Sequence, residues 1–157
     1  MIALSIVIII GASIMTVIIA IEKPVQLTNY SMQPYHIYDM NANEIIGKEI
    51  AFNKNYTIKI ETSNLSKEGS ILVYKLTDKE GKSVSNAQLK LLVSHPFESK
   101  FDTEYTDVKQ EGSLYTFDTI KLANEGRWNL MLYIEVDNYS RYYNLKADTR
   151  NSNTFDL

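Results

Sequence analysis

Methionine and histidine are the side chains of this sequence whose spacing could hold a metal ion. Met32, His36 and Met40 are spaced four residues apart, and thioether and imidazole groups are soft ligands that select Cu(I). In a helix this spacing would place all three on one face. Pro34 interrupts the segment, however, and such Met and His pairs also arise by chance. The three residues are therefore candidate copper ligands, and unliganded linker residues are the simpler interpretation.

Other residues capable of catalysis are few. The chain has two histidines, His36 and His95, and no cysteine, and it contains neither a glycine-rich phosphate loop nor an HExxH motif. Asp102, Glu104 and Asp107 form an acidic cluster, but calcium binding would need more carboxylates at loop spacing. A solvated strand edge is the simpler interpretation of that cluster. We therefore expect a protein that is not an enzyme and that carries no cofactor.

The sequence Gly126-Arg127-Trp128 offers a candidate for surface contact. Exposed tryptophan marks many interfaces, but Trp128 begins a series of alternating apolar residues that ends at Val136. This position predicts that the indole belongs to the core. Arg127 points to the other side of the same strand and is the better candidate for contact with a partner.

Residues 1–21 carry no charged side chain and nine of them are isoleucine. As a helix they would span roughly 31 Å, which matches a hydrocarbon core of roughly 30 Å. A cleaved signal peptide is the alternative, but the apolar run is longer than the usual core of such a peptide, and Ile18 stands where cleavage after Ala20 would need a small residue. The sequence thus predicts an uncleaved, single-pass anchor with a cytoplasmic N-terminus and an exported domain.

A stripe of small residues follows one face of this predicted helix. It consists of Ser5, Ala12, Thr16 and Ala20, with Gly11 beside it. Small residues at such spacing allow a second membrane helix to approach closely. They are also ordinary constituents of membrane segments, so a docking face and simple filler are both open.

The rest of the chain divides into a linker, one domain and a tail. Residues 22–47 contain Pro24 and Pro34, and they predict an extended linker with at most a short strand or helix near Ile45. Residues 48–150 predict one β-rich domain, and residues 151–157 predict a frayed polar tail. The chain of 157 residues has a net charge of −3, which gives no reason to expect nucleic acid as a partner.

Alternation of apolar and polar residues predicts about seven strands in the domain. Pro96 ends the expected strand Ala87–Ser94, because proline cannot donate to a β ladder. Asp137-Asn138 predicts a hairpin turn. Regular turn signals and the absence of cysteine indicate an immunoglobulin-like sandwich without a disulfide. The expected strands are Tyr56–Ile60, Ile71–Leu76, Ala87–Ser94, an irregular edge strand at Phe101–Val108, Leu114–Leu122, Trp128–Val136 and Tyr139–Ala147.

The order of these features resembles the FixH/CcoH family, which is related to the YtkA-like domains, over nearly the whole chain. The motifs that carry the resemblance follow the N-terminal span in the order Tyr56-Thr57-Ile58, Asp78 to Val84, Asn86-Ala87-Gln88-Leu89, Gly112-Ser113-Leu114-Tyr115 and Gly126-Arg127-Trp128-Asn129-Leu130. The resemblance implies a bacterial inner-membrane protein with a periplasmic domain that helps to assemble cbb3-type cytochrome c oxidase. It also implies contact with oxidase subunits and work alongside a copper-transporting P-type ATPase, and it brings no catalytic residues.

Three functions therefore compete at the level of sequence. The first is a membrane-anchored assembly or accessory factor that acts by protein contact. The second is a periplasmic copper carrier that uses Met32, His36 and Met40. The third is a generic binding module of a membrane complex.

Overall fold

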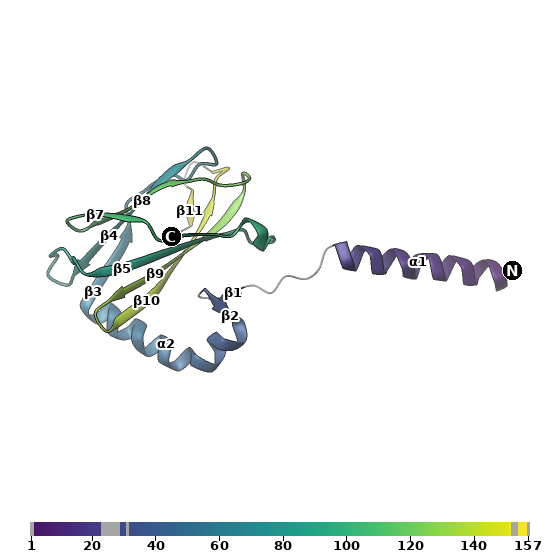
Figure 1. The fold of residues 1–157 in the computed structure, drawn as a ribbon, viewed down its shortest axis with the longest axis horizontal. Helices are drawn as coiled ribbons and strands as arrows, with labels where there is room; N and C mark the ends of the chain where they lie inside the picture. Colours follow the sequence, from purple (N-terminus) through teal and green to yellow (C-terminus); the bar gives the residue numbers. More distant parts are fainter. Residues whose placement is uncertain (1, 23–28, 31, 152–153, 157) are drawn as a thin grey trace.

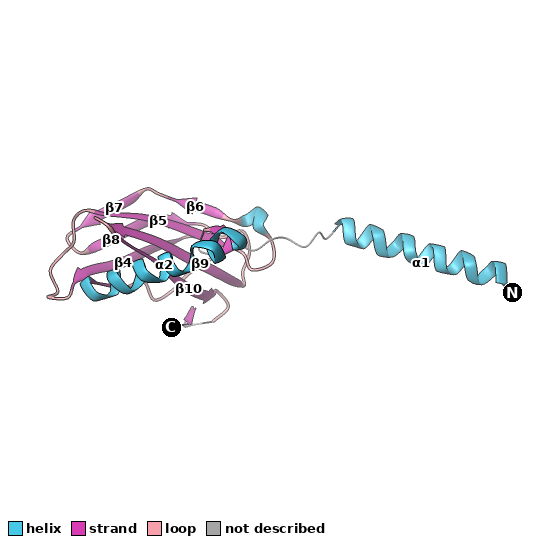
Figure 2. Ribbon diagram, turned by 90° about the horizontal axis from the view of Figure 1, so that it is seen from below, coloured by secondary structure: helices cyan, strands magenta, loops and turns pink. Residues whose placement is uncertain are grey.

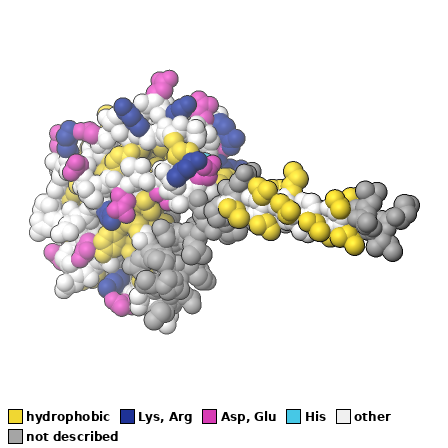
Figure 3. Space-filling model, turned by 45° about the vertical axis from the view of Figure 1, so that its right-hand side comes forward, with side chains coloured by type: hydrophobic (Ala, Val, Ile, Leu, Met, Phe, Trp, Pro, Cys, Tyr) yellow, Lys and Arg dark blue, Asp and Glu magenta, His cyan; other side chains and the backbone are white. Residues whose placement is uncertain are grey.

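The computed structural model describes residues 2–22, 29–30, 32–151 and 154–156, with side chains omitted for 2–5, 20, 22, 29–30, 33–40 and 156. The chain begins with helix α1, Ile2–Glu22, whose described side chains are mostly apolar and exposed (Figure 3). Across the described residues, no helix meets the combined length and hydropathy that a membrane crossing requires.

A second helix precedes the β-rich part of the chain. Two short strands, β1 (Asn29–Tyr30) and β2 (Gln33–Pro34), pair with each other and lead into α2, Tyr35–Asn55. The expected extended linker over residues 22–47 is therefore wrong from Tyr35 onward, and residue 48, the expected start of the domain, lies inside this helix. Pro34 is the physical reason, because a proline immediately before a helix favours its start rather than interrupting it.

The strands form two antiparallel sheets on either side of one core (Figure 1). A five-stranded sheet has the order β11-β10-β9-β5-β6, and a four-stranded sheet has the order β3-β4-β8-β7. A 3-10 turn, η1 (Ser99–Phe101), precedes β6. The strand bounds are β3 Tyr56–Ile60, β4 Ser70–Asp78, β5 Ala87–Ser94, β6 Thr103–Tyr105, β7 Val108–Glu111, β8 Leu114–Ile120, β9 Arg127–Val136, β10 Tyr139–Asp148 and β11 Phe155–Asp156.

The alternation in the sequence predicts most of these strands closely. Expected strands at Tyr56–Ile60 and Ala87–Ser94 coincide with β3 and β5, and the expected hairpin joins β9 to β10 through Asp137. Asp137 has φ +52°, a left-handed conformation that Asp adopts more readily than most residues in a tight turn. The irregular edge strand expected at Phe101–Val108 is instead divided among η1, β6 and the start of β7.

The C-terminal tail is not uniformly frayed, so that expectation is corrected. Strand β11 pairs with β10, and Phe155 packs against the core. Thr154 is buried, and its hydroxyl accepts a hydrogen bond of 2.9 Å from the backbone N–H of Leu65. The tail therefore adds a strand to one edge of the five-stranded sheet and satisfies a buried donor.

Candidate interaction surfaces

Helix α2 brings its second half into the core beside β10. Phe52 is fully buried, and its ring centroid lies 5.2 Å from that of Tyr56. Arg141 on β10 donates a 2.5 Å hydrogen bond from Nη1 to Asn53 Oδ1, and its Nε lies 3.5 Å from Glu49 Oε1. An aromatic anchor and a partly buried arginine thus fix the helix against the sandwich.

The middle of the same helix lies over the outer face of β9 and β10 (Figure 2). A cavity of about 200 Å³ opens between them. The cavity is lined by Asn41, Glu44, Ile45, Lys48, Tyr133, Ser140 and Tyr142.

Charged and phenolic groups determine the chemistry of this cavity. Lys48 Nζ lies 2.7 Å from Glu44 Oε1, which lowers the pKa of that carboxyl through a hydrogen bond and charge. Tyr133 donates from its hydroxyl to Glu135 Oε2 at 3.0 Å, and burial raises the pKa of this tyrosine. The rings of Tyr133 and Tyr142 lie 5.0 Å apart. Hydrogen-bonding groups beside aromatic surface suit the recognition of a polar peptide segment.

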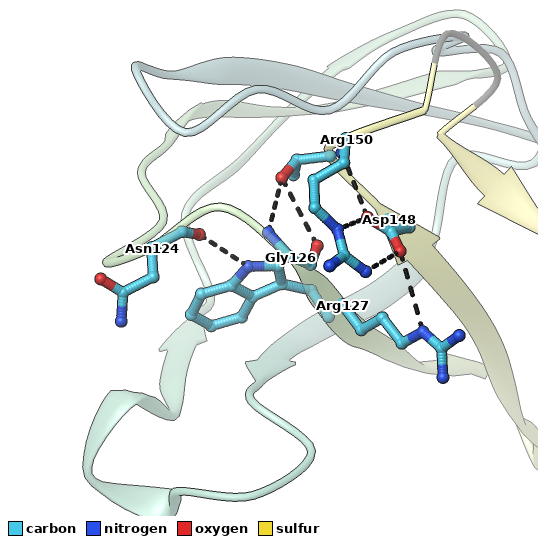
Figure 4. Close-up of polar contacts among 7 residues, drawn as sticks. Asn124, Gly126, Arg127, Asp148 and Arg150 are labelled. Atoms are coloured by element: carbon cyan, nitrogen blue, oxygen red, sulfur yellow. Dashed lines mark hydrogen bonds and ion pairs between the residues drawn. The ribbon is translucent and has the colours of Figure 1, made fainter.

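Trp128 stands near the start of β9 in the five-stranded sheet, at a corner where Asn124, Gly126, Arg127, Asp148 and Arg150 lie close together (Figure 4). The side chain is only 1% exposed, as the alternation predicts, and its Nε1–H donates to the carbonyl of Asn124 at 3.0 Å. Gly126 has φ +134°, a conformation that favours glycine. Its N–H donates to Thr149 Oγ1 at 2.9 Å, which ties the entrance of β9 to the end of β10.

Two arginines share one carboxylate at this corner. Arg150 donates to Asp148 through Nε at 2.8 Å and Nη2 at 2.6 Å, and Arg127 Nε lies 3.7 Å from the same carboxylate. The hydrogen bond from Arg150 is the main reason that the pKa of Asp148 falls to about 2. Arg127 remains 75% exposed, so it stays available for contact with a partner.

His95 lies beside Trp128 and connects it to a neighbouring loop. The imidazole makes edge contacts with Trp128, Phe101 and Phe97, with centroid distances of 5.1, 5.7 and 5.9 Å. Asp102 Oδ1 accepts a 3.1 Å hydrogen bond from the backbone N–H of His95, yet burial still raises the pKa of this carboxyl. Asp102 is thus a brace for the loop, whereas Glu104 of the same sequence cluster pairs with Lys90 at 2.7 Å.

The structure separates part of the candidate copper set. Met32 lies before α2 with φ +57°, whereas His36 and Met40 are within the helix, and their side chains lie outside the described residues. The geometry in which all three occupy one helical face is therefore wrong for Met32. Among the described residues, no group of three or more His, Cys, Asp or Glu side chains could hold a metal ion.

The small-residue stripe lies on α1. Ala12 and Thr16 are exposed, and the hydroxyl of Thr16 donates to the carbonyl of Ala12 at 2.9 Å. That internal bond satisfies the only polar group of the pair and leaves a shallow surface. The side chains of Ser5 and Ala20 lie outside the described residues.

Sequence reasoning did not identify the face formed by α2 and the outer side of β9. Its phenolic groups are Tyr133 of β9 and Tyr142 of β10, which lie on the side of these strands that faces away from the core. The sequence signals for the helix were Pro34 before its start, Lys54 in its last turn, and Ala42, Ile45, Glu49 and Phe52 at spacings of three and four.

Comparison with known proteins gives one result for the chain as a whole. A family model described as FixH matches residues 1–148. This match extends from α1 through α2 to the end of β10. No curated protein and no solved structure matches the chain.

Proposed function

Because the chain belongs to the FixH family, we propose that it is an accessory factor for the assembly of cbb3-type cytochrome c oxidase, acting by protein contact. The observation that carries this proposal is the match over residues 1–148, which includes both helices and nearly all of the β structure. Its partners are oxidase subunits, and a copper-transporting P-type ATPase acts beside it. The protein is not an enzyme and binds no nucleic acid.

Membrane attachment is part of the proposed function. Helix α1 ends at Glu22 and carries no charged side chain before that residue. Each apolar residue near the middle of such a segment favours insertion by about 0.5 kcal/mol. This composition supports an uncleaved anchor in the bacterial inner membrane, with the N-terminus in the cytoplasm and the β domain in the periplasm.

The β domain is proposed to be an immunoglobulin-like sandwich. The order β3-β4-β8-β7 corresponds to strands A, B, E and D of that fold, and β5, β9 and β10 correspond to C, F and G. Strands β6 and β11 extend the second sheet at its edges. Such a sandwich presents strand faces and loops to partners without needing a catalytic centre.

Two surfaces are proposed to make the contacts. One is the stripe that includes Ala12 and Thr16, because close backbone approach drives helix pairing in lipid. The other is the cavity between α2 and the outer face of β9 and β10, where the Lys48 ammonium lies near the phenolic groups of Tyr133 and Tyr142. Arg127 adds an exposed cation at the corner of the sheet.

Copurification from membranes tests the proposal. The intact protein is extracted in a mild detergent and captured, and oxidase subunits are expected to copurify with it. The Ala12→Leu, Thr16→Leu double variant fills the stripe while keeping α1 apolar, so it should be present at normal levels and retain fewer oxidase subunits. Capture of the intact protein without any oxidase subunit, from cells that make the oxidase, would contradict the proposed contact.

A further inference from the structure

Phe97 is an exposed aromatic residue at the tip of the loop between β5 and η1. Its side chain is 78% exposed, more than any other large hydrophobic residue among the described side chains. Burial of a phenylalanine side chain stabilises a protein by about 1.5–3 kcal/mol. Because the Phe97 ring is exposed, the isolated chain gains almost none of this stabilisation there. The ring is therefore available for contact with another apolar phase.

The loop holds Phe97 in place. The backbone N–H of Phe97 donates to His95 Nδ1 at 3.4 Å, and the backbone N–H of Phe101 donates to Glu98 O at 3.3 Å. His95 in turn rests against the buried indole of Trp128. The loop that carries the exposed ring therefore packs, through His95, against an aromatic residue of the core. The ring is exposed because the ordered loop holds it outside the core.

This loop lies at the end of the domain where the chain arrives from α1. Ser94, the last residue of β5, pairs with Asn129 near the start of β9. Figure 1 shows β1 and the short green helical turn η1 at that end of the sandwich. Residues 23–28 are the six residues between α1 and β1, and such a segment spans at most about 20 Å when fully extended.

We propose that the Phe97 loop is a second membrane contact, with the phenylalanine ring seated at the boundary between lipid headgroups and acyl chains. This inference rests on the proposed anchoring of α1, because the short connection then keeps this end of the domain close to the bilayer. Phenylalanine is among the apolar side chains that membrane-bound segments bury at that boundary. Lys100 already pairs with Glu98 at 2.5 Å, so the apolar ring rather than net charge drives the contact.

The absence of cysteine makes a direct test possible. Three single-cysteine variants of the full chain, Phe97→Cys, Ile14→Cys and Asn138→Cys, are labelled with an environment-sensitive fluorophore and reconstituted into phosphatidylcholine vesicles. Vesicles with and without spin-labelled phosphatidylcholine are compared, because the spin label quenches only a fluorophore that touches lipid. Ile14 reports the anchor. Asn138 is exposed at the far end of β9, about 30 Å away along a strand of ten residues.

The proposal predicts that spin-labelled lipid lowers fluorescence at positions 14 and 97 by roughly twofold or more and leaves position 138 unchanged. Quenching at 14 without quenching at 97 would overturn the proposed tip and leave the anchor intact. Lack of quenching at both positions would overturn the anchor and the tip together. Unchanged emission of the buried Trp128 in an unlabelled Phe97→Cys protein verifies that the domain is folded.

Replacing phosphatidylcholine partly with an anionic phospholipid separates insertion from charge attraction. Equal quenching at position 97 in neutral and anionic vesicles supports insertion of the loop tip into lipid without charge attraction. Quenching at 97 that occurs only in anionic vesicles and disappears in high salt would overturn it in favour of a charge contact. A position 97 that is quenched in neither but becomes shielded when purified oxidase is added would overturn the lipid contact in favour of a protein one.

Discussion

The indole of Trp128 fills part of the core and also fixes the start of β9. Its ring is almost fully buried and its N–H is satisfied by Asn124. We expect Trp128→Ala to lower the free energy of unfolding by about 3–5 kcal/mol, the usual range for loss of a large buried aromatic. Chemical unfolding of the protein in mild detergent measures this loss.

Arg127→Ala is the matched control, because Arg127 is adjacent in sequence and exposed. It should change the free energy of unfolding by no more than about 0.5 kcal/mol. An unfolding midpoint for Trp128→Ala equal to that of the parent protein would mean that the indole contributes nothing to the core.

The carboxylate of Asp148 predicts a specific acid sensitivity. Its pKa is lowered from 3.8 to about 2, chiefly by the hydrogen bond from Arg150. A depressed pKa means that the folded state favours the charged form. The stabilisation is therefore fully present above pH 3.8 and is lost as the pH falls toward about 2.

The difference in stability between the parent protein and an Asp148→Asn variant isolates this carboxylate from the other acidic groups. Thermal unfolding should show the parent as the more stable protein at pH 5, with the difference shrinking steadily between pH 4 and pH 2. A difference that stays constant across this range would show that the carboxylate has an ordinary pKa in the folded chain.

At the scale of elements, α2 is the part that sequence reasoning described least well. Strands with clean alternation, such as β4, are predictable because one face meets the core and the other is more exposed to water. Helix α2 has a weaker pattern, because its inward stripe at Ala42, Ile45, Glu49 and Phe52 includes a charged residue, while Ile46 and Ile50 are exposed. Its position depends on tertiary contacts of Phe52 and Arg141, and residues nearly 90 positions apart in sequence give no local signal.

The contact of α2 with the core predicts how the helix responds to mutation. Phe52→Ala should lower the free energy of unfolding by about 3–5 kcal/mol, because the ring is fully buried against Tyr56. Ile50→Ala, two positions earlier and exposed, should have little effect. Amide hydrogen exchange gives a second readout, since loss of the Phe52 anchor should accelerate exchange throughout α2 while β5 remains protected. Equal exchange in both variants would mean that the helix is held by other contacts.

The candidate surfaces differ in how far sequence alone could define them. The stripe that includes Ala12 and Thr16 could be predicted from the sequence, because a helix repeats every 3.6 residues. The cavity beside Tyr133 could not be predicted, because its lining comes from three elements, α2, β9 and β10, and no local sequence pattern indicates how they pack. The shared helical face expected for Met32, His36 and Met40 is wrong at Met32, because α2 begins only at Tyr35 and spacing predicts one face only within a continuous helix.

At the scale of the whole molecule, the proposed anchor, the short connection and the β domain would together place a binding surface at the membrane. A helix that pairs through small residues needs lipid around it, and the cavity and Arg127 need an accessible domain. The proposed assembly role would use both the membrane helix and the exposed domain, because an oxidase presents both membrane helices and exposed segments for contact. The family match supports the proposed assembly role, and the surfaces described above are where the proposed contacts would occur.

Oxidase activity in a strain that lacks this gene is the most direct test of the assembly role. Membranes from cells grown under low oxygen are assayed for cbb3-type activity, and the deletion is complemented with the parent gene or with the Ala12→Leu, Thr16→Leu variant. The proposed assembly role predicts that deletion strongly reduces active oxidase and that the parent gene restores it. The double variant should restore it only in part, at normal protein levels. Full oxidase activity in the deletion strain would contradict the assembly role.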